Sequence, residues 1–494
     1  MKNDLQKINL NILIAGFLLF LMSFSALYAQ SKAEKIEKLM QTYHKYGQFN
    51  GSVLVAENGK VIYKDGLGMA NMEWDIPNTA NTKHRLGSIT KQFTASLIML
   101  LAEEGKLDQQ KPVSTYLPDY PKPMGDEITI HHLLTHTSGI PNYTSFPGFF
   151  EEKSRDPYKP EEFVETFADS SLQFTPGEKF AYSNSGYFLL GYIIEKVTGK
   201  PYEEVLQEKI LTPLGMKDTG YDHQETILKN RASGYEKTGN GYRNAPYLDM
   251  SIPYAAGSLY STAEDLYKWD QALYTGEILS EASKKKMFTP QVPNGSGGYG
   301  YGWGMNYSKL ENSKDSILTI GHGGGINGFN TNIIRVPEDR NLLVLLNNTG
   351  GANLSDIGEN IKHILYNESY EQPKKSVAKE LLSTIAEQGL EAALARFKEL
   401  KSDDQYALRE NEINIAGYQL LRTGMTKEAI AVFKLNVEEF PESGNVYDSL
   451  GEAYMEDGNI EMAIKNYEKS VEIDPGNNNG AQILKDLKAK RKSK

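Results

Sequence analysis

Cysteine is absent from the 494-residue sequence. This absence excludes a thiolate nucleophile, a thiolate metal site and a lipidated cysteine. Hydroxyl, amine, carboxylate and imidazole groups remain as the candidates for chemistry. An exported chain of this composition would meet oxidising surroundings and would still depend on packed cores, because it has no disulfides.

The sequence also has fewer basic than acidic residues. The formal net charge is −11, and the basic run KDLKAKRKSK lies at the C-terminal end. Nucleic acid is therefore not an expected partner, and the run is interpreted as a solvated chain end.

Several site signatures are missing too. The sequence has no G-x-S-x-G elbow, Walker loop or dinucleotide fingerprint, which excludes α/β-hydrolase and nucleotide-binding sites. His132 and His136 have the spacing of a helical metal pair, but no nearby glutamate or third ligand completes H-E-x-x-H. We expect a structural role for the pair, and neither a metal nor another cofactor. Trp74, Trp269 and Trp303 are expected in the core or in a pocket wall.

The N-terminus has the order of an export signal. Lys2 and Lys7 precede an apolar run over residues 12–21 and the small-residue stretch SFSALYAQ. This predicts a signal peptide over residues 1–29, cleaved after Ala29. Because residues 12–29 approach spanning length, an uncleaved signal anchor in a membrane is the alternative. Either form predicts export, to the periplasm or outside the cell.

The sequence up to residue 366 mixes strand and helix patterns. Residues 51–64, GSVLVAENGKVIYK, read as two strands joined at Asn58-Gly59, a strong hairpin signal. DSILTIGH and FNTNIIRVPEDRNLLVLLNN predict further strands, and LSDIGENIKHILY predicts a closing helix. Helical patterns at 88–104, around TIHHLLTHTSG and at 185–198 lie between them, each followed by a glycine. The order predicts an α+β domain over residues 33–366, with one antiparallel sheet and a helical lobe.

A second, all-α domain is predicted after a polar segment. YNESYEQPKKS suggests a linker at residues 367–376, and residues 377–494 read as helix. Five residue pairs recur at a spacing of 34: Gly417 and Gly451, Gly424 and Gly458, Ala429 and Ala463, Phe433 and Tyr467, Pro441 and Pro475. The pattern resembles the tetratricopeptide repeat. Residues 376–406 are expected to add a degenerate helix pair and residues 481–487 a capping helix, because two repeats bury little core. Such repeats indicate a protein partner, and a stabilising or dimerising surface is the alternative.

Ser88 and Lys91 are the leading candidates for chemistry. They are three residues apart in RLGSITKQ, so a helix would place the hydroxyl and the amine on one face. The apolar residues that follow predict that this helix is buried. A desolvated amine loses its proton more readily and is then able to accept one from Ser88.

Two other segments fit the same chemistry. Tyr182 and Asn184 precede an apolar helix in FAYSNSGYFLLG, where a phenol could relay a proton and an amide could hold substrate. The alternative for this segment is a simple helix N-cap at residues 183–185. In TIGHGGGINGFNT a strand runs into residues 322–325, where the backbone N–H of Gly325 could pair with that of Ser88 as an oxyanion hole.

Together the three segments resemble the serine β-lactamase and penicillin-binding-protein superfamily, and more narrowly its class C β-lactamase-related group of D-alanyl-D-alanine carboxypeptidases, D-aminopeptidases and esterases. HHLLTHTSGIPNY, LGYIIEKVTGKPYEE, PLGMKDTGY, AAGSLYSTAEDLYKW and GYGYGWG fit the same group. The resemblance implies a β-lactamase/transpeptidase-like fold. It makes Ser88 the acylated nucleophile, Lys91 its base and Tyr182 the proton relay.

The resemblance also assigns substrate contacts. Asn184 matches the asparagine of Y-x-N, and His322, Gly323 and Gly324 match the K-T-G-type triad. Histidine in place of lysine removes a fixed positive charge, because its reference pKa is about 6.5. The expectation is either a preference for neutral esters or amides, or better binding of carboxylates at mildly acid pH, where the imidazole is charged.

These patterns predict an exported serine hydrolase that acts through a covalent acyl-enzyme on an amide or ester. A D-amino-acid peptide, a β-lactam and a simple ester stay open as substrates. The alternative is a catalytically idle penicillin-binding-like sensor or scaffold of the cell wall, whose repeats bind a partner.

Overall fold

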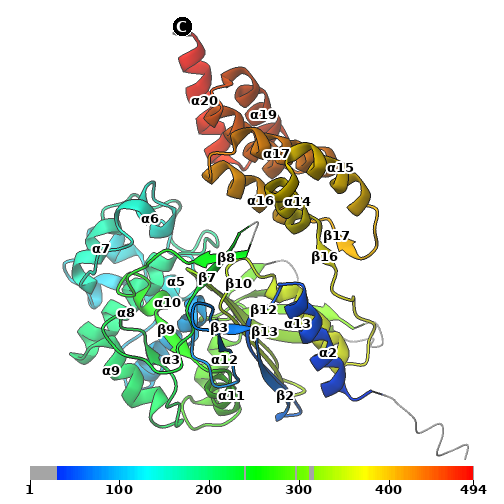
Figure 1. Cartoon of the computed structure of the whole chain (residues 1–494). Helices are drawn as coiled ribbons and strands as arrows, with labels where there is room; N and C mark the ends of the chain where they lie inside the picture. Colours follow the sequence, from blue (N-terminus) through cyan, green and yellow to red (C-terminus); the bar gives the residue numbers. More distant parts are fainter. Residues whose placement is uncertain (1–29, 239–240, 295–296, 311–315, 493–494) are drawn as a thin grey trace, which may run out of the picture.

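A computed structural model of the chain describes residues 30–238, 241–294, 297–310 and 316–492. A mixed α and β part holds the first two thirds of the chain, and a helical part follows it (Figure 1). The predicted signal segment, residues 1–29, lies outside the described residues. Within the described ranges, no helix combines the length and apolarity needed to cross a membrane.

One antiparallel sheet organises the first part. Its eight strands have the order β10-β11-β12-β13-β14-β15-β1-β2, so the N-terminal β1 pairs with the much later β15. The strands are β1 (Gly51–Glu57), β2 (Lys60–Leu67), β10 (Val292–Asn294), β11 (Gly297–Tyr299), β12 (Gly304–Lys309), β13 (Ser316–Ile326), β14 (Phe329–Val336) and β15 (Asn341–Asn347). The predicted sheet built from both ends of the domain is confirmed.

The hairpin between β1 and β2 forms where Asn58-Gly59 predicted it. Asn58 and Gly59 have φ angles of 52° and 73°, and asparagine and glycine tolerate this left-handed region best.

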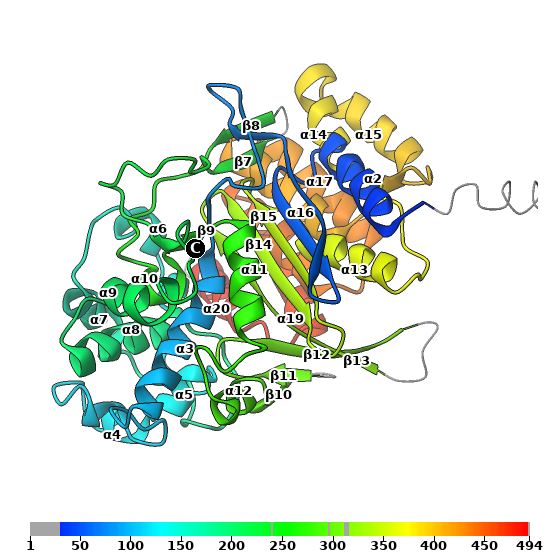
Figure 2. The ribbon, with the colours of Figure 1, turned by 90° about the horizontal axis from the view of Figure 1, so that it is seen from below.

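Both faces of the central strands are covered, which explains why β1 and β15 are apolar almost throughout. On one face, Val53, Val55, Leu343 and Leu345 pack against α2 (Lys32–Lys45) and α13 (Leu354–Leu365). On the other, Leu54, Ala56, Leu342, Val344 and Leu346 belong to the large core that includes α3 (Thr90–Glu103) and α11 (Ala263–Ala272). Figure 2 shows α11 on one side of these strands and α2 with α13 on the other.

The helical lobe lies beside this sheet. It contains α4 (Met124–Glu127), α5 (Ile130–Leu134), α6 (Phe149–Glu152), α7 (Pro160–Ala168), α8 (Asn184–Thr198), α9 (Tyr202–Leu206), α10 (Tyr254–Gly257) and α12 (Glu281–Met287). Short helical turns are η1 (Gly87–Ile89), η2 (Val113–Thr115), η3 (Tyr143–Ser145) and η4 (Gln207–Leu211). Three small sheets pair β3 (Met69–Asn71) with β4 (Ile76–Pro77), β5 (His84–Arg85) and β6 (Gly220–Tyr221) with β9 (Leu259–Ser261), and β7 (Tyr235–Thr238) with β8 (Gly241–Asn244).

Two sequence predictions need correction here. The helix predicted around TIHHLLTHTSG is only the short α5, because His136 takes a left-handed φ of 58° that no α-helix continues through. Trp269 and Trp303 are fully buried as predicted, but Trp74 is 79% exposed, so its expected place in a core or pocket wall is wrong.

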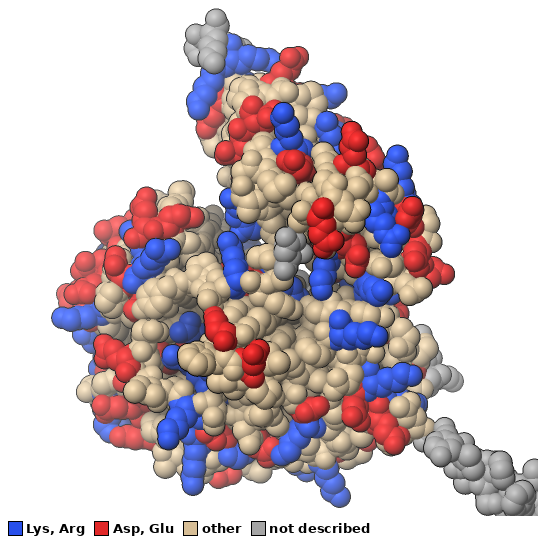
Figure 3. Space-filling view, in the orientation of Figure 1, with Lys and Arg blue, Asp and Glu red and all other residues tan. Residues whose placement is uncertain are grey.

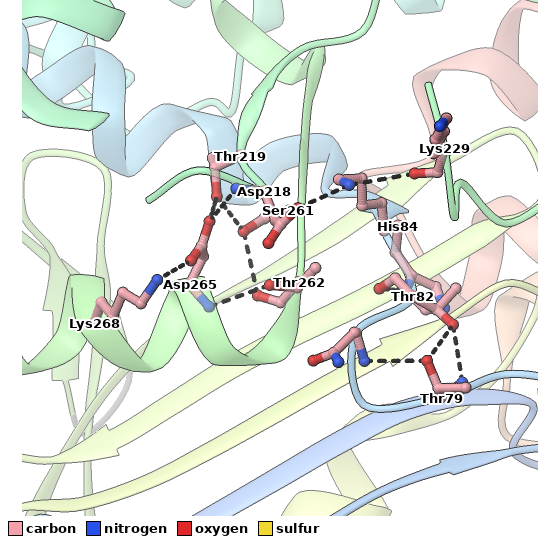
Figure 4. Close-up of polar contacts among 12 residues, drawn as sticks. Thr79, Thr82, His84, Asp218, Thr219, Lys229, Ser261, Thr262, Asp265 and Lys268 are labelled. Carbon is pink, nitrogen blue, oxygen red and sulfur yellow. Dashed lines mark hydrogen bonds and ion pairs between the residues drawn. The ribbon is translucent and has the colours of Figure 1, made fainter. Parts of the chain in front are cut away.

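A polar network lies beside β9, the strand that pairs with β5 ahead of Ser88, and joins it through the Thr219 and Ser261 hydroxyls. Figure 4 shows the buried Asp265 accepting from the Asp218 N–H at 2.8 Å and from the Thr219 hydroxyl at 3.0 Å. Nearby, one ring nitrogen of the buried His84 lies 3.0 Å from the Thr82 carbonyl oxygen. Burial lowers the pKa of His84 to about 4, so the imidazole is neutral and its Nδ1–H donates.

The helical part consists of antiparallel pairs. They are α14 (Val377–Gln388), α15 (Leu390–Leu400), α16 (Glu410–Arg422), α17 (Thr426–Glu439), α18 (Gly444–Glu456) and α19 (Ile460–Ile473), followed by α20 (Asn478–Lys492). The short strands β16 (Lys375–Ser376) and β17 (Tyr406–Ala407) pair in parallel beside α14. A Cβ at Gly417 would lie 2.5 Å from the Phe433 ring, so helices α16 and α17 require the small residue that the repeat pattern predicted.

Candidate active site

Ser88 lies on a tight turn between β5 and a buried helix. It is the middle residue of η1, directly before α3. Gly87 has a φ of 54°, and a Cβ placed there would be 3.0 Å from the backbone nitrogen of Gly325. The turn therefore packs closely against β13, which brings the first and third sequence segments together.

Lys91 is completely buried one turn after Ser88. Its Nζ lies 3.1 Å from Ser88 Oγ, 2.8 Å from Asn184 Oδ1 and 2.8 Å from the Ala256 carbonyl oxygen. Among the described residues, no carboxylate forms an ion pair with this amine. The predicted pair is thus assembled, and Asn184 from the second segment joins it.

Burial lowers the pKa of Lys91 well below its usual value. The Asn184 and Ala256 oxygens only accept hydrogen bonds, so they take two N–H groups of the amine. A neutral amine then directs its lone pair at the third neighbour, the hydroxyl of Ser88. The geometry suits an amine that accepts the Ser88 proton.

Tyr182 lies over the same group. Its ring centroid is 4.9 Å from Lys91 Nζ, and its pKa is raised by burial and lowered to a smaller extent by the Ser88 hydroxyl. The phenol is therefore protonated at neutral pH. Among the described residues its buried Oη has no hydrogen-bond partner that meets ordinary geometry, which leaves it free to serve a substrate atom.

The N-cap interpretation of residues 183–185 does not fit the contacts. Ser183 occupies the N-cap position of α8, but its side chain makes no capping bond. The Ser185 hydroxyl instead donates to the Pro141 carbonyl at 2.7 Å. Asn184 donates its backbone N–H to Asn142 Oδ1 at 3.1 Å, which holds its side chain near Lys91.

Strand β13 supplies the remaining predicted residues. A Cβ at Gly324 would lie only 2.0 Å from the Leu86 carbonyl oxygen, so this position admits glycine alone. Thr331 on β14 donates its hydroxyl to the same carbonyl at 2.6 Å. Gly323 is open by comparison, since the nearest atom to its Cβ position is 3.8 Å away. Gly324 therefore sets the approach of the strand to the Ser88 turn.

His322 belongs to a chain of hydrogen bonds that crosses the site. Its Nδ1 lies 2.6 Å from the Gly323 carbonyl oxygen and its Nε2 lies 3.0 Å from Tyr299 Oη. Tyr299 Oη is also 3.3 Å from His136 Nε2, and His136 Nδ1 accepts from the Ser183 N–H at 3.1 Å. The Gly323 carbonyl needs a proton on His322 Nδ1, and the Ser183 N–H needs an unprotonated Nδ1 on His136. Nε2 of His136 therefore donates to Tyr299 Oη, and Tyr299 Oη donates to Nε2 of His322.

Both histidines of this chain are neutral. Burial, and Lys91 when it is protonated, lower the pKa of His322 to about 4, although its bond to Gly323 raises it. Burial likewise holds the pKa of His136 well below its usual value. This direction runs against the expectation that His322 becomes charged at mildly acid pH, because desolvation disfavours the charged imidazole.

A small cavity opens beside the nucleophile. Its volume is about 120 Å³, and Ser88, Asn184 and Gly325 border it. Large apolar side chains also line it: Tyr143, Phe149, Phe150, Leu248 and Ile252. Among the described residues no cluster of three or more histidine or acidic side chains is arranged to hold a metal ion.

Comparison with known proteins decides the family. The Beta-lactamase family matches residues 33–367. The chain belongs to this family. A tetratricopeptide repeat matches residues 444–477, so the C-terminal part carries that repeat.

Relatives of this β-lactamase-family chain are hydrolases and penicillin-binding proteins. Penicillin-binding protein 4* of Bacillus subtilis (strain 168) is 33% identical over 71% of this chain and 80% of its own length. Teichoic acid D-alanine hydrolase of Staphylococcus aureus is 32% identical over 53% of this chain and 60% of its own length. The crystal structure of D-amino acid amidase from Ochrobactrum anthropi SV3 superposes with a TM-score of 0.58, at 27% identity over 67% of this chain and 99% of that one. The prediction of a β-lactamase-related serine hydrolase fold and enzyme class is confirmed.

Three groups of this β-lactamase-family site were missed by sequence reasoning. They are the Ala256 carbonyl, the Tyr299 phenol and the His136 imidazole, which was expected to be merely structural. Ala256 and Tyr299 lie in AAGSLYSTAEDLYKW and GYGYGWG, segments that resembled the family but carried no spacing signal for a role.

Proposed function

We propose that this protein is an exported serine hydrolase that forms a covalent acyl-enzyme at Ser88. The observation that carries the proposal is the surroundings of Lys91. A fully buried amine with two accepting neighbours, and no carboxylate partner among the described residues, has its lone pair left for the hydroxyl 3.1 Å away.

The first half-reaction begins at Ser88. Its Oγ attacks the carbonyl carbon of the substrate while Lys91 takes the hydroxyl proton. The backbone N–H groups of Ser88 and Gly325 receive the negative charge that develops on the carbonyl oxygen. The close packing of Gly87 and Gly324 holds these two donors on facing segments.

Collapse of the tetrahedral intermediate releases the leaving group. Lys91 returns its proton through Tyr182, whose neutral phenol protonates the leaving nitrogen or oxygen as its bond to carbon breaks. Water then attacks the acyl group on Ser88 and gives up a proton by the same route in reverse. The products are the free acid and the free amine or alcohol, and Ser88 regains its hydroxyl.

A D-aminoacyl ester or amide fits the site best as substrate. The cavity beside Ser88 is small and lined largely by apolar side chains, which suits a short acyl group. Neutral His322 offers no fixed cation to a substrate carboxylate. Related proteins include one named for D-alanine hydrolysis and one for D-amino acid amides, and this supports the same class here.

The proposal also includes export of the protein and the binding of a partner by its repeats. The signal-like residues 1–29 predict export, and a penicillin-binding protein among the relatives accords with it. The C-terminal helices α14 to α20, with their tetratricopeptide repeat, accord with binding a protein or peptide. A catalytically idle sensor would not need a desolvated lysine beside Ser88. The contacts of Lys91 with Ser88 and Asn184 therefore favour the enzyme.

Steady-state kinetics test this proposal. We expect D-alanine methyl ester and D-alanine p-nitroanilide to be hydrolysed faster than their L-forms and faster than the cephalosporin nitrocefin. Ser88→Ala should abolish turnover, whereas replacing the exposed Ser171 by alanine should not. Undiminished turnover by Ser88→Ala would contradict the mechanism, and an L-preference would contradict the substrate class alone.

A variant at His322 tests the charge argument. His322→Lys should raise the ratio of kcat/KM for nitrocefin to that for the D-alanine ester about fivefold or more, because it supplies a cation for the carboxylate. In the wild type this ratio should stay flat between pH 5 and 8, since the pKa of His322 is about 4. A ratio that rises as the pH falls through 6.5 would show that the imidazole titrates there.

A further inference from the structure

One face of α3 contacts two successive backbone carbonyls of the short helix α10. The amine of Lys91 donates to the Ala256 carbonyl at 2.8 Å. One turn further along α3, the Thr94 hydroxyl donates to the Ala255 carbonyl at 2.6 Å. Residues three apart on a helix share a face, so the two bonds run side by side. The last carbonyls of a helix have no partner within it, and α10 therefore depends on α3 for these bonds.

A phenol sets the direction of the Thr94 hydroxyl. Tyr202 Oη lies 2.8 Å from Thr94 Oγ1, and the Thr90 carbonyl is farther away, at 3.4 Å. The hydroxyl has one proton, which points to the Ala255 carbonyl at 2.6 Å, so the phenol is the donor between the two side chains. Burial raises the pKa of Tyr202, which keeps the phenol protonated. The hydrogen bonds therefore run from Tyr202 to Thr94 and on to the backbone of α10.

The backbone of α10 begins in an unusual conformation. Tyr254 has a φ of 41°, a left-handed value that a bulky residue rarely adopts and that persists only where neighbouring contacts hold it. Its ring packs against Phe188 and Tyr202, with centroid distances of 4.8 and 5.3 Å. A Cβ at Gly191 of α8 would lie 2.5 Å from the Tyr254 ring, so the glycine makes room for it. The place of the two carbonyls thus depends on contacts from α3, α8 and α9.

These contacts lie inside the helical lobe. Figure 3 shows acidic and basic side chains mixed on the visible face of this lobe. In contrast, Thr94 and Ala255 have no exposed surface, and Tyr202 is 1% exposed. A hydrogen bond in buried surroundings is stronger than one in water, and its loss leaves a polar group without a partner. A single buried hydroxyl is therefore able to set the position of a carbonyl.

We propose that Thr94 is a positioning residue of the reaction, because its hydroxyl holds the end of α10 where the Ala256 carbonyl meets the amine of Lys91. Thr94 is not among the residues that line the cavity beside Ser88, so it acts through the backbone of α10. The inference rests on the proposed function, since it gives Thr94 a part in the proton transfer from Ser88 to Lys91. With the carbonyl in place, an N–H of the amine is engaged and its lone pair is directed at Ser88.

The Ala256 carbonyl also influences how readily Lys91 takes up a proton. An oxygen accepts more strongly from an ammonium than from a neutral amine, so a carbonyl that moves away lets the pKa of Lys91 fall further. The other titratable groups that face Lys91 are Tyr182, Tyr187, His136 and His322. Burial shifts the pKa of each toward its uncharged form, so we assign the acid limb of the pH profile to Lys91.

The pH profile of the full chain tests this role. The substrate is p-nitrophenyl acetate, an ester without a titrating group. Thr94→Val keeps the shape of the side chain and removes the hydroxyl. We expect the plateau of kcat/KM to fall about tenfold or more, because the base is displaced. The acid limb should move to lower pH by about half a unit or more, because the amine loses an accepting oxygen.

Three further variants separate positioning from stability. Thr94→Ser keeps the hydroxyl and should restore the plateau to within about twofold of the wild type, with an unshifted limb. Tyr202→Phe should shift the limb in the same direction as Thr94→Val and by less, since Thr94 keeps its bond to Ala255. Ser96→Ala is the matched control, because Ser96 is a buried residue of the same helix whose hydroxyl donates to the Gln92 carbonyl at 2.8 Å. It should keep the wild-type plateau and limb.

The proposal is overturned if folded Thr94→Val keeps the wild-type limb, or if Ser96→Ala shifts the limb as far as Thr94→Val does. A limb that moves to higher pH also contradicts it, because the entry of water, and not the loss of an acceptor, has that effect. If Thr94→Val does not fold, an unchanged limb in Tyr202→Phe overturns the proposal. Failure of the hydrolase mechanism is distinct, since it appears as undiminished turnover by Ser88→Ala.

Discussion

At the scale of single residues, the site depends on uncharged forms of groups that are usually charged or titrating near neutrality. Burial lowers the pKa of Lys91, and it lowers the pKa of His322 and His136 although a hydrogen bond of each imidazole to the backbone raises it. Part of this was visible in the sequence, because Ser88 and Lys91 open an apolar helix. The tautomers of the histidines were not, since they depend on Tyr299, which reaches the site from a distant strand.

The pH dependence of Lys91 gives the first prediction. A base must be unprotonated, so kcat/KM should rise as the pH increases through the pKa of Lys91 and then level off. Since that pKa lies well below 10.5, the rise should be complete well below it. Lys91→Met should lower kcat/KM by about 10²- to 10⁴-fold, the usual contribution of a general base, and should remove this rise. A pH profile of the variant that matches the wild type would show that another group is the base.

Tyr299 gives the second prediction. Tyr299→Phe removes the phenol that joins His136 to His322 and leaves each imidazole without a partner on its Nε2. We expect kcat to fall about tenfold with little change in KM, because the positions of Tyr182 and of β13 become less well fixed. Tyr307→Phe, at an exposed position of β12, is the matched control. An equal loss in both variants, or a rise in KM alone, would contradict a positioning role.

At the scale of elements, the sequence predicted most of what depends on local pattern. The β1–β2 hairpin follows from Asn58-Gly59, and α16 to α19 follow from a repeat in which Gly444 begins its helix 34 residues after Glu410. Two predictions failed, and in the first of them packing overrode local preference. The helix around residues 129–139 stops at Leu134 so that His136 turns toward Ser183, and Trp74 lies on the surface.

Strand β13 gives a prediction of its own. Gly324→Ala places a methyl group 2.0 Å from the Leu86 carbonyl oxygen, so the strand must move away from the Ser88 turn. We expect a clear drop in melting temperature and a loss of ester turnover of about 100-fold or more, the size typical of a displaced oxyanion donor. Gly323→Ala meets nothing closer than 3.8 Å and should melt close to the wild type. Melting curves of the two variants that coincide would show that the contact with Leu86 does not set the strand's position.

At the scale of the whole molecule, the residues that we assign to the reaction all precede the helical part. We therefore predict that a shortened chain of residues 30–367 folds and hydrolyses a small ester within about twofold of the full-length rate. Truncation removes the hydrogen bond from Gln419 to the Lys237 carbonyl, and this bond lies outside the catalytic group. Circular dichroism and ester turnover check this directly. An unfolded fragment, or a folded one without turnover, would mean that the repeats complete the active site.

The central claim is that Ser88 is the acylated nucleophile, and covalent labelling tests it most directly. A fluorophosphonate probe should add a single mass adduct to the intact protein, and proteolysis should map that adduct to the peptide that contains Ser88. Ser88→Ala should show no adduct while keeping the wild-type melting temperature, and Ser171→Ala should label like the wild type. An adduct that persists in Ser88→Ala, or that maps to another serine of the wild type, would contradict the account.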